Sequence, residues 1–148
     1  MARNVFFSFH YQRDIFRVNQ IRNLPEIIDQ AAAGFKDSSL WEEAKKKGDA
    51  DVKRLIDNGL HGTSVTVVCI GSQTAGRKFI NYEIQKSIDR GNGIVGVQIH
   101  HLTPPNAPAD PVGRTPALLT HHGYPIFKYD NHKKLKEWIE AAAKQAGH

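Results

Sequence analysis

The stretch GSQTAGRKFINYEIQKSIDRG, residues 71–91, carries one acidic residue, Glu83, near the start of a predicted amphipathic helix. It follows the apolar run SVTVVCIG through a short polar loop. Two interpretations of this carboxylate are open. Glu83 could be a solvated residue on the helix border that pairs with Lys86, or it could be the working group of an active site.

Helical geometry places Glu83 beside the buried face of its helix. The buried stripe consists of three isoleucines, Ile80, Ile84 and Ile88. At about 100° per residue, Glu83 projects roughly 60° to one side of this stripe, near the direction of Phe79. A helix that begins near Phe79 would place Glu83 in its first or second turn, facing a crevice beside Ser72. Periodicity alone leaves both interpretations open.

Continuously apolar strands that alternate with amphipathic helices predict a parallel sheet covered on both faces. The expected fold is a doubly wound, flavodoxin-like α/β fold with three layers, α/β/α. We expect strands at residues 4–9, near Phe35, and at 64–70, 93–99 and 125–129. We expect helices at 14–33, interrupted at Pro25, at 49–60, from about 79, and at 131–146.

Two segments are predicted to be irregular. Residues 33–49 should contain the short second strand followed by a long loop, and 102–124 read as a proline-rich surface loop of unknown purpose. With 148 residues, one domain spanning 1–148 is the default expectation.

In open parallel sheets, ligands bind outside the carboxyl ends of the strands where the strand order reverses. Here that point lies between the first and third strands, next to Ser8, Phe9, His10 and Ser72. No glycine-rich phosphate loop or dinucleotide fingerprint follows a strand. The strand ends also lack the acidic residues of a phospho-receiver, and FHYQRD is not a flavin phosphate loop.

Composition narrows the function classes further. The net charge of +5 suits an anionic ligand, but scattered basic residues without a stripe of interleaved aromatics make nucleic acid an unlikely partner. Cys69 is expected in the core, and no third ligand joins the His100-His101 or His121-His122 pairs in a metal site. We find neither a membrane-spanning run nor a signal-peptide pattern, so we expect a cytoplasmic protein.

Three separated motifs resemble the TIR-like domains of Thoeris antiphage defence systems. They are RNVFFSFHYQRDIFRVNQIRN, DSSLWEEAKK and GTSVTVVCIGSQTAGRKFINYEIQKSIDRGN, and together they cover about two thirds of the chain. The resemblance implies a TIR-like fold and an enzyme that uses NAD as its substrate, without a cofactor. It would cleave the nicotinamide–ribose bond and form a signalling nucleotide, often cyclic, that activates a partner effector after phage infection.

By position, the resemblance makes Glu83 the catalytic residue. It also implies a nucleotide site lined by Ser8, Phe9, His10, Asp37, Ser39, Leu40, Trp41 and Ser72, and we count Arg77 and Phe79 among the substrate-binding candidates as well. Trp41 could stack on a base or anchor its loop, and Ser72 could contact the ligand or cap the helix. His10 could likewise touch the ligand or only cap its loop, and Arg77 could meet the diphosphate or be solvated.

Two other functions stay open. A non-catalytic TIR-like scaffold would not need Glu83, and a nucleoside deoxyribosyltransferase-like enzyme would use one glutamate on a nucleoside. A phage-derived trigger and a homo-oligomer are compatible with the resemblance.

Overall fold

Five parallel strands form one sheet in the order β2-β1-β3-β4-β5. The computed structural model describes residues 3–22, 27–29, 39–103 and 107–148, of which 27–29 and 39–41 are described by their backbone alone. The strands are β1 (Arg3–Ser8), β2 (Ile27–Asp29), β3 (Val65–Ile70), β4 (Gly93–Gln98) and β5 (Ile126–Lys128). The order is the predicted flavodoxin-like one: after β2 the chain crosses back over β1 and adds β3 on its other side, so the strand order reverses between β1 and β3.

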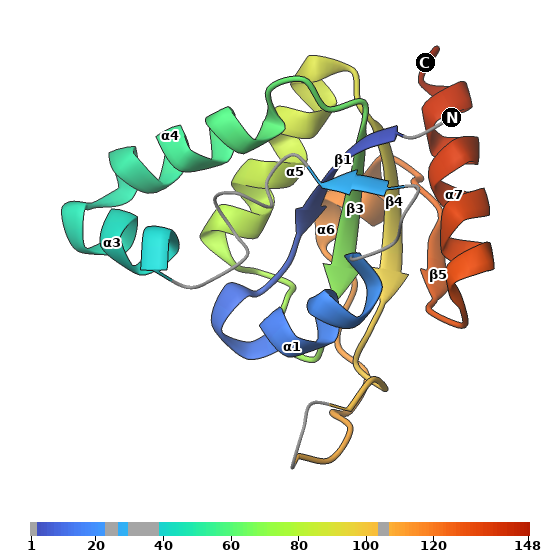
Figure 1. Cartoon of the computed structure of the whole chain (residues 1–148), viewed down its shortest axis with the longest axis horizontal. Helices are drawn as coiled ribbons and strands as arrows, with labels where there is room; N and C mark the ends of the chain where they lie inside the picture. The colour runs from blue at the N-terminus through green and yellow to red at the C-terminus, as the bar shows by residue number, and fades with distance from the viewer. Residues whose placement is uncertain (1–2, 23–26, 30–38, 104–106) are drawn as a thin grey trace.

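Helices cover both faces of the sheet and complete the predicted three-layer α/β/α fold. They are α1 (Tyr11–Arg22), α3 (Ser39–Lys47), α4 (Asp49–Leu60), α5 (Lys78–Arg90), α6 (Ala117–His121) and α7 (His132–Gln145). Figure 1 shows α7 on one side of the sheet and α4 with α5 on the other. Among the described helices, none is long and apolar enough to cross a membrane.

Alternate residues of β3 supply the two halves of the core. Val67 and Cys69 pack in the cluster that includes α1 and α7, whereas Val68 and Ile70 pack with α5 and α6. The prediction that Cys69 is a core residue is confirmed, since its exposed fraction is 0%. All six residues of β3 are buried, as expected of a central strand covered on both faces.

The pairing of β1 with β3 decides which way Ser8 points. Ser8 is the register partner of Val68, so both side chains leave the sheet on the face that α5 covers. Phe7 pairs with Val67 and turns to the opposite face. The last side chain of β1 is therefore directed at the helix that carries Glu83.

The helix predicted for residues 14–33 is wrong at both ends. Tyr11–Arg22 form α1, so Asp14 lies in its first turn instead of starting it. Ile27–Asp29 form β2 and pair with β1 through Ile27 opposite Arg3. β-branched residues suit a strand, and their spacing had mimicked a helical stripe. The strand predicted near Phe35 and the interruption at Pro25 lie outside the described residues.

Two predicted loops contain helices. α3 occupies Ser39–Lys47 within the predicted loop 33–49, because the helix formers of WEEAKKK place acidic residues early and lysines late, which complements the helix dipole. α6 occupies Ala117–His121 within the predicted loop 102–124. Its Leu119 is fully buried against the α5 face of the sheet, which explains why this short turn is ordered.

Candidate active site

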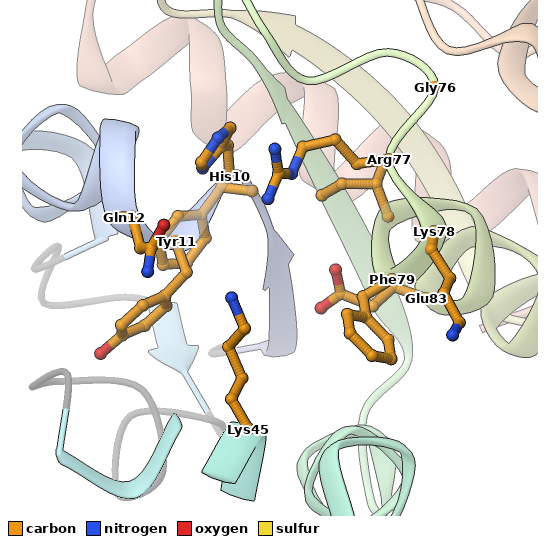
Figure 2. Close-up of a pocket in the computed structure, with 11 residues that line it drawn as sticks. His10, Tyr11, Gln12, Lys45, Gly76, Arg77, Lys78, Phe79 and Glu83 are labelled. Atoms are coloured by element: carbon orange, nitrogen blue, oxygen red, sulfur yellow. The ribbon is translucent and has the colours of Figure 1, made fainter. Parts of the chain in front are cut away.

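A cavity of about 320 Å³ opens at the carboxyl end of β1, between the starts of α1 and α5 (Figure 2). It is lined by Phe9, His10, Tyr11, Gln12, Lys45, Gly76, Arg77, Lys78, Phe79, Ile80 and Glu83. We call residues 9–12 the α1 wall and residues 76–80 the α5 wall. The location is the one predicted from the strand order, and five residues that the sequence singled out line the cavity: Phe9, His10, Arg77, Phe79 and Glu83.

Glu83 is buried at the base of this cavity, with 4% of its surface exposed. Its Oε1 accepts a hydrogen bond from the hydroxyl of Ser8 at 3.0 Å. Figure 2 shows its carboxylate pointing into the space between the two walls. The alternative that Glu83 is a solvated residue paired with Lys86 is wrong, because the Lys86 ammonium lies over the Tyr82 ring.

Burial controls the protonation of Glu83. Loss of hydration raises the pKa of this carboxyl well above its usual range, and the hydrogen bond from Ser8 opposes the shift only in part. The main chain beneath it is also held, since the Ser87 hydroxyl donates to the Glu83 carbonyl at 2.7 Å. Glu83 therefore has the raised pKa and the fixed geometry that are typical of a catalytic carboxylate.

Ser8 is fully buried and reaches Glu83 instead of lining the cavity. The sequence predicted that Ser8 would contact a ligand, and that contact stays untested. Because its only described side-chain hydrogen bond runs to Oε1, Ser8 holds one carboxylate oxygen and leaves the other for a ligand.

His10 lies in the α1 wall with 7% of its surface exposed. Burial, followed by the nearby charge of Arg77, lowers the pKa of His10 to about 4. Its Nδ1 accepts from the backbone N–H of Arg13 at 3.3 Å, so the neutral ring carries its proton on Nε2. His10 can thus offer a neutral N–H donor next to a cation.

Three cations border the cavity. Lys78 pairs with Asp49 of α4, and its ammonium also lies over the Phe79 ring. Arg77 and Lys45 have no acidic partner among the described residues. Figure 2 shows the Arg77 guanidinium directed toward His10 and the Lys45 ammonium rising from α3 into the cavity. Two cations are therefore available for an anionic ligand.

Sequence reasoning missed Lys45, because the segment that carries it was predicted to be a loop. The usable signal was the charge order of WEEAKKK, which is typical of a helix with its basic end last. Ser39, Leu40 and Trp41 form the first turn of the same helix, and their contacts with a ligand remain predictions. Asp37 lies outside the described residues.

Ser72 makes its described contacts away from the cavity. Its hydroxyl donates to Oδ2 of Asp110 at 3.1 Å and accepts from Nε of Arg13 at 3.2 Å. The alternative that Ser72 caps the following helix is wrong, because the N-cap of α5 is Arg77. In the parts of the chain that the structure describes, no three His, Cys, Asp or Glu side chains gather as a metal site would require.

The chain matches known proteins in sequence over the residues that line this cavity. The model of the TIR-like domain of the Thoeris protein ThsB matches residues 6–104, a range that contains every residue lining the cavity. The chain is also 47% identical over 144 residues to a protein of Bacillus cereus (strain MSX-D12) named "Putative cyclic ADP-D-ribose synthase ThsB1". That alignment covers 93% of this chain and 72% of the relative. The chain belongs to the family of Thoeris ThsB proteins with a TIR-like domain.

Proposed function

We propose that this chain is an enzyme of antiphage defence that cleaves the nicotinamide–ribose bond of NAD and converts the ADP-ribose part into a cyclic signalling nucleotide. The observation that carries the proposal is Glu83, a buried carboxylate held by Ser8 in a cavity bordered by Arg77 and Lys45. The name of the Bacillus cereus relative, "Putative cyclic ADP-D-ribose synthase ThsB1", supports the same chemistry.

One carboxylate is enough for the bond-breaking step. When the bond between C1′ of the ribose and the nicotinamide nitrogen breaks, its electron pair goes to that nitrogen, and positive charge grows at C1′. A carboxylate beside C1′ stabilises this charge in a site from which water is excluded. Nicotinamide leaves as a neutral molecule, so the step needs no general acid. Glu83 supplies that carboxylate in our proposal.

The substrate itself would ionise Glu83. In the free protein burial raises the pKa of Glu83, which favours the neutral carboxyl. The positive nicotinamide ring of bound NAD favours the charged form, because an opposite charge nearby lowers the pKa of an acid. Glu83 would thus release its proton to solvent as NAD binds, and the carboxylate would be present when the scissile bond is in place.

The nucleophile determines the product. An atom of the adenosine half that bonds to C1′ gives a cyclic product, whereas water gives ADP-ribose, and a nucleophilic N–H or O–H group releases its proton to solvent. The rings of Phe9 and Tyr11 stack with centroids 5.5 Å apart and give the α1 wall an aromatic part beside the polar His10 and Gln12. A closed site with few waters favours the internal nucleophile.

The rest of the pathway is part of the same proposal. In this proposal the nucleotide activates an effector protein, a phage-derived trigger starts the reaction, and the enzyme works in the cytoplasm, in one or several copies, with NAD as substrate and no cofactor. A scaffold that only associates with other domains does not require a buried carboxylate in a cavity. A nucleoside deoxyribosyltransferase-like enzyme does not require free cations, and Arg77 and Lys45 favour a substrate with a diphosphate.

The test is nucleotide analysis by chromatography and mass spectrometry of cells that express the protein, with and without phage challenge. Glu83→Gln is compared with Asp89→Asn, which removes an exposed carboxylate from the same helix. We expect loss of NAD-derived ADP-ribose products with Glu83→Gln and parental amounts with Asp89→Asn. If cells with Glu83→Gln resist phage as well as cells with the parent protein, and neither contains such a nucleotide, the protein is a scaffold instead.

A further inference from the structure

The proline-rich segment is docked on the protein through Asp110 and Gly113, beyond the range that the family model matches. Gly113 packs so closely on the loop after β3 that a Cβ there would lie 2.3 Å from the carbonyl oxygen of Gly71. Asp110 makes side-chain contacts with both α1 and this loop. We call residues 107–113 the brace.

Asp110 binds Arg13 with both carboxylate oxygens. Nε of Arg13 donates to Oδ2 and Nη2 donates to Oδ1, each at 3.0 Å. The Ser72 hydroxyl donates to the same Oδ2 at 3.1 Å. This bidentate geometry fixes the relative orientation of Arg13 and Asp110, which a single hydrogen bond would not do.

The inner side of the contact is buried. Nη1 of Arg17, whose side chain is 3% exposed, lies 3.3 Å from Asp110 and 3.1 Å from Asp14. Nε of Arg17 donates to the carbonyl of Leu102 at 2.8 Å, so the start of the proline-rich segment joins the same network. Two arginines and two aspartates thus balance each other in one cluster.

The two elements joined by Asp110 lead directly into the two walls of the cavity. Arg13 follows the α1 wall, and its backbone N–H holds the His10 ring. Ser72 begins the loop that ends at the α5 wall with Gly76 and Arg77. Asp110 itself does not line the cavity, so any effect on a ligand there must pass through these walls.

We propose that Asp110 is a positioning residue, which holds the α1 and α5 walls at the separation that a dinucleotide substrate requires. The proposal rests on the proposed function for the identity of the substrate. It assigns a role to the segment for which the sequence indicated none. Misplacing one wall weakens substrate binding more than bond cleavage, because Glu83 is held separately by Ser8.

Two single variants and their combination test the proposal. Asp110→Asn keeps the shape of the side chain but removes its charge. Arg13→Gln alters a side chain that is 38% exposed, so the Arg13→Gln protein should fold even if the Asp110→Asn protein does not. Arg114→Ala, an exposed change next to the brace, is the matched control. We expect KM for NAD to rise about tenfold in each single variant, with kcat within about twofold. The rise in KM of the double variant should be smaller than the two single effects combined, since both substitutions break the contact between Arg13 and Asp110.

Amide hydrogen exchange without NAD separates this proposal from the proposed function. We expect faster exchange at residues 10–14 and 72–79 in Asp110→Asn and Arg13→Gln, with unchanged exchange in α7 and in Arg114→Ala. Unchanged exchange at both walls would overturn the positioning role, whatever the substrate. Additive effects on KM would also overturn it, because they would show that Asp110 and Arg13 act independently. Faster exchange throughout the described fold would do the same, because it would indicate general destabilisation. Failure of the proposed function is recognised independently, by NAD turnover that persists in Glu83→Gln.

Discussion

The hydroxyl of Ser8 donates to Oε1 of Glu83 at 3.0 Å and thereby joins the last residue of β1 to the second turn of α5. Both groups are buried, with 0% and 4% of their surfaces exposed. A hydrogen bond to a carboxylate favours its charged form, so Ser8 opposes the rise in pKa that burial imposes on Glu83. The serine therefore helps to set both the orientation and the charge of the proposed catalytic group.

Ser8→Ala should move the acid limb of the kcat–pH profile to higher pH. Without its donor, the Glu83 carboxylate is less stable and its pKa rises further. We expect kcat at neutral pH to fall by about tenfold or more, the range for losing a hydrogen bond to a charged group. The measurement is the rate of nicotinamide release from NAD across the pH range.

Ser87→Ala is the matched control for Ser8→Ala. It also removes a fully buried hydroxyl, but one that binds the Glu83 main-chain carbonyl and Thr66. We expect it to lower stability and to leave the acid limb in place. If both variants shift the limb equally, the side-chain hydrogen bond does not set the pKa of Glu83.

Glu83→Gln should make the protein more stable at neutral pH while abolishing activity. The folded pKa of Glu83 is raised above the unfolded value near 4.5, so its stabilising contribution is fully present below that value and is lost as the pH rises toward the raised pKa. Each unit of the shift is equivalent to about 1.4 kcal/mol. Glutamine does not ionise and still accepts from Ser8.

Urea unfolding at several pH values measures this difference. We expect Glu83→Gln to exceed the parent protein in free energy of unfolding at pH 8 and to match it near pH 4, whereas Asp89→Asn should follow the parent throughout. A variant that is less stable at pH 8 would show that burying the carboxylate is not costly.

Much of the fold and the central residues of the site could be predicted from the local pattern of apolar and polar residues. The apolar run of β3 indicated a central strand. The rule for strand ends predicted Phe9 and His10 at the crevice, and the start of the following helix placed Glu83 beside them. Side chains alternate along β1, so Ser8 must point to the opposite face from Phe7. Which of the two faces Ser8 takes is fixed only by its pairing with Val68 of β3. Helical periodicity placed Glu83 at a border, and tertiary contacts buried it.

The remaining features depend on information that a local pattern does not hold. Ile27 and Ile28 fit a helical stripe and a strand equally well, and pairing with β1 favours the strand. Asp110 binds Arg13 across 97 positions of sequence. A contact of this kind has no periodic signature, so the proline-rich segment read only as a loop.

Arg77→Gln should raise the pKa of His10. Burial is the larger cause of the value of about 4, and the Arg77 charge is the second, so the pKa should rise but stay below the ordinary 6.5. Titration of the His10 ring by NMR, assigned with His10→Asn, measures it. Arg90→Gln at the far end of α5 is the control and should leave the value unchanged. An unchanged pKa in Arg77→Gln would show that the guanidinium does not act on His10.

Lys45→Ala should weaken binding of NAD but not of nicotinamide riboside, which has no diphosphate. The Lys45 ammonium rises into the cavity, whereas Lys46 is an exposed neighbour that does not line it. We expect KM for NAD to rise about two- to fivefold in Lys45→Ala, the effect of one exposed charge pair, and to stay unchanged in Lys46→Ala. The difference should shrink at high salt, because screening weakens exposed charges. If both substrates lose affinity equally, Lys45 shapes the cavity instead of binding the diphosphate, and preference for a dinucleotide would then depend on Arg77.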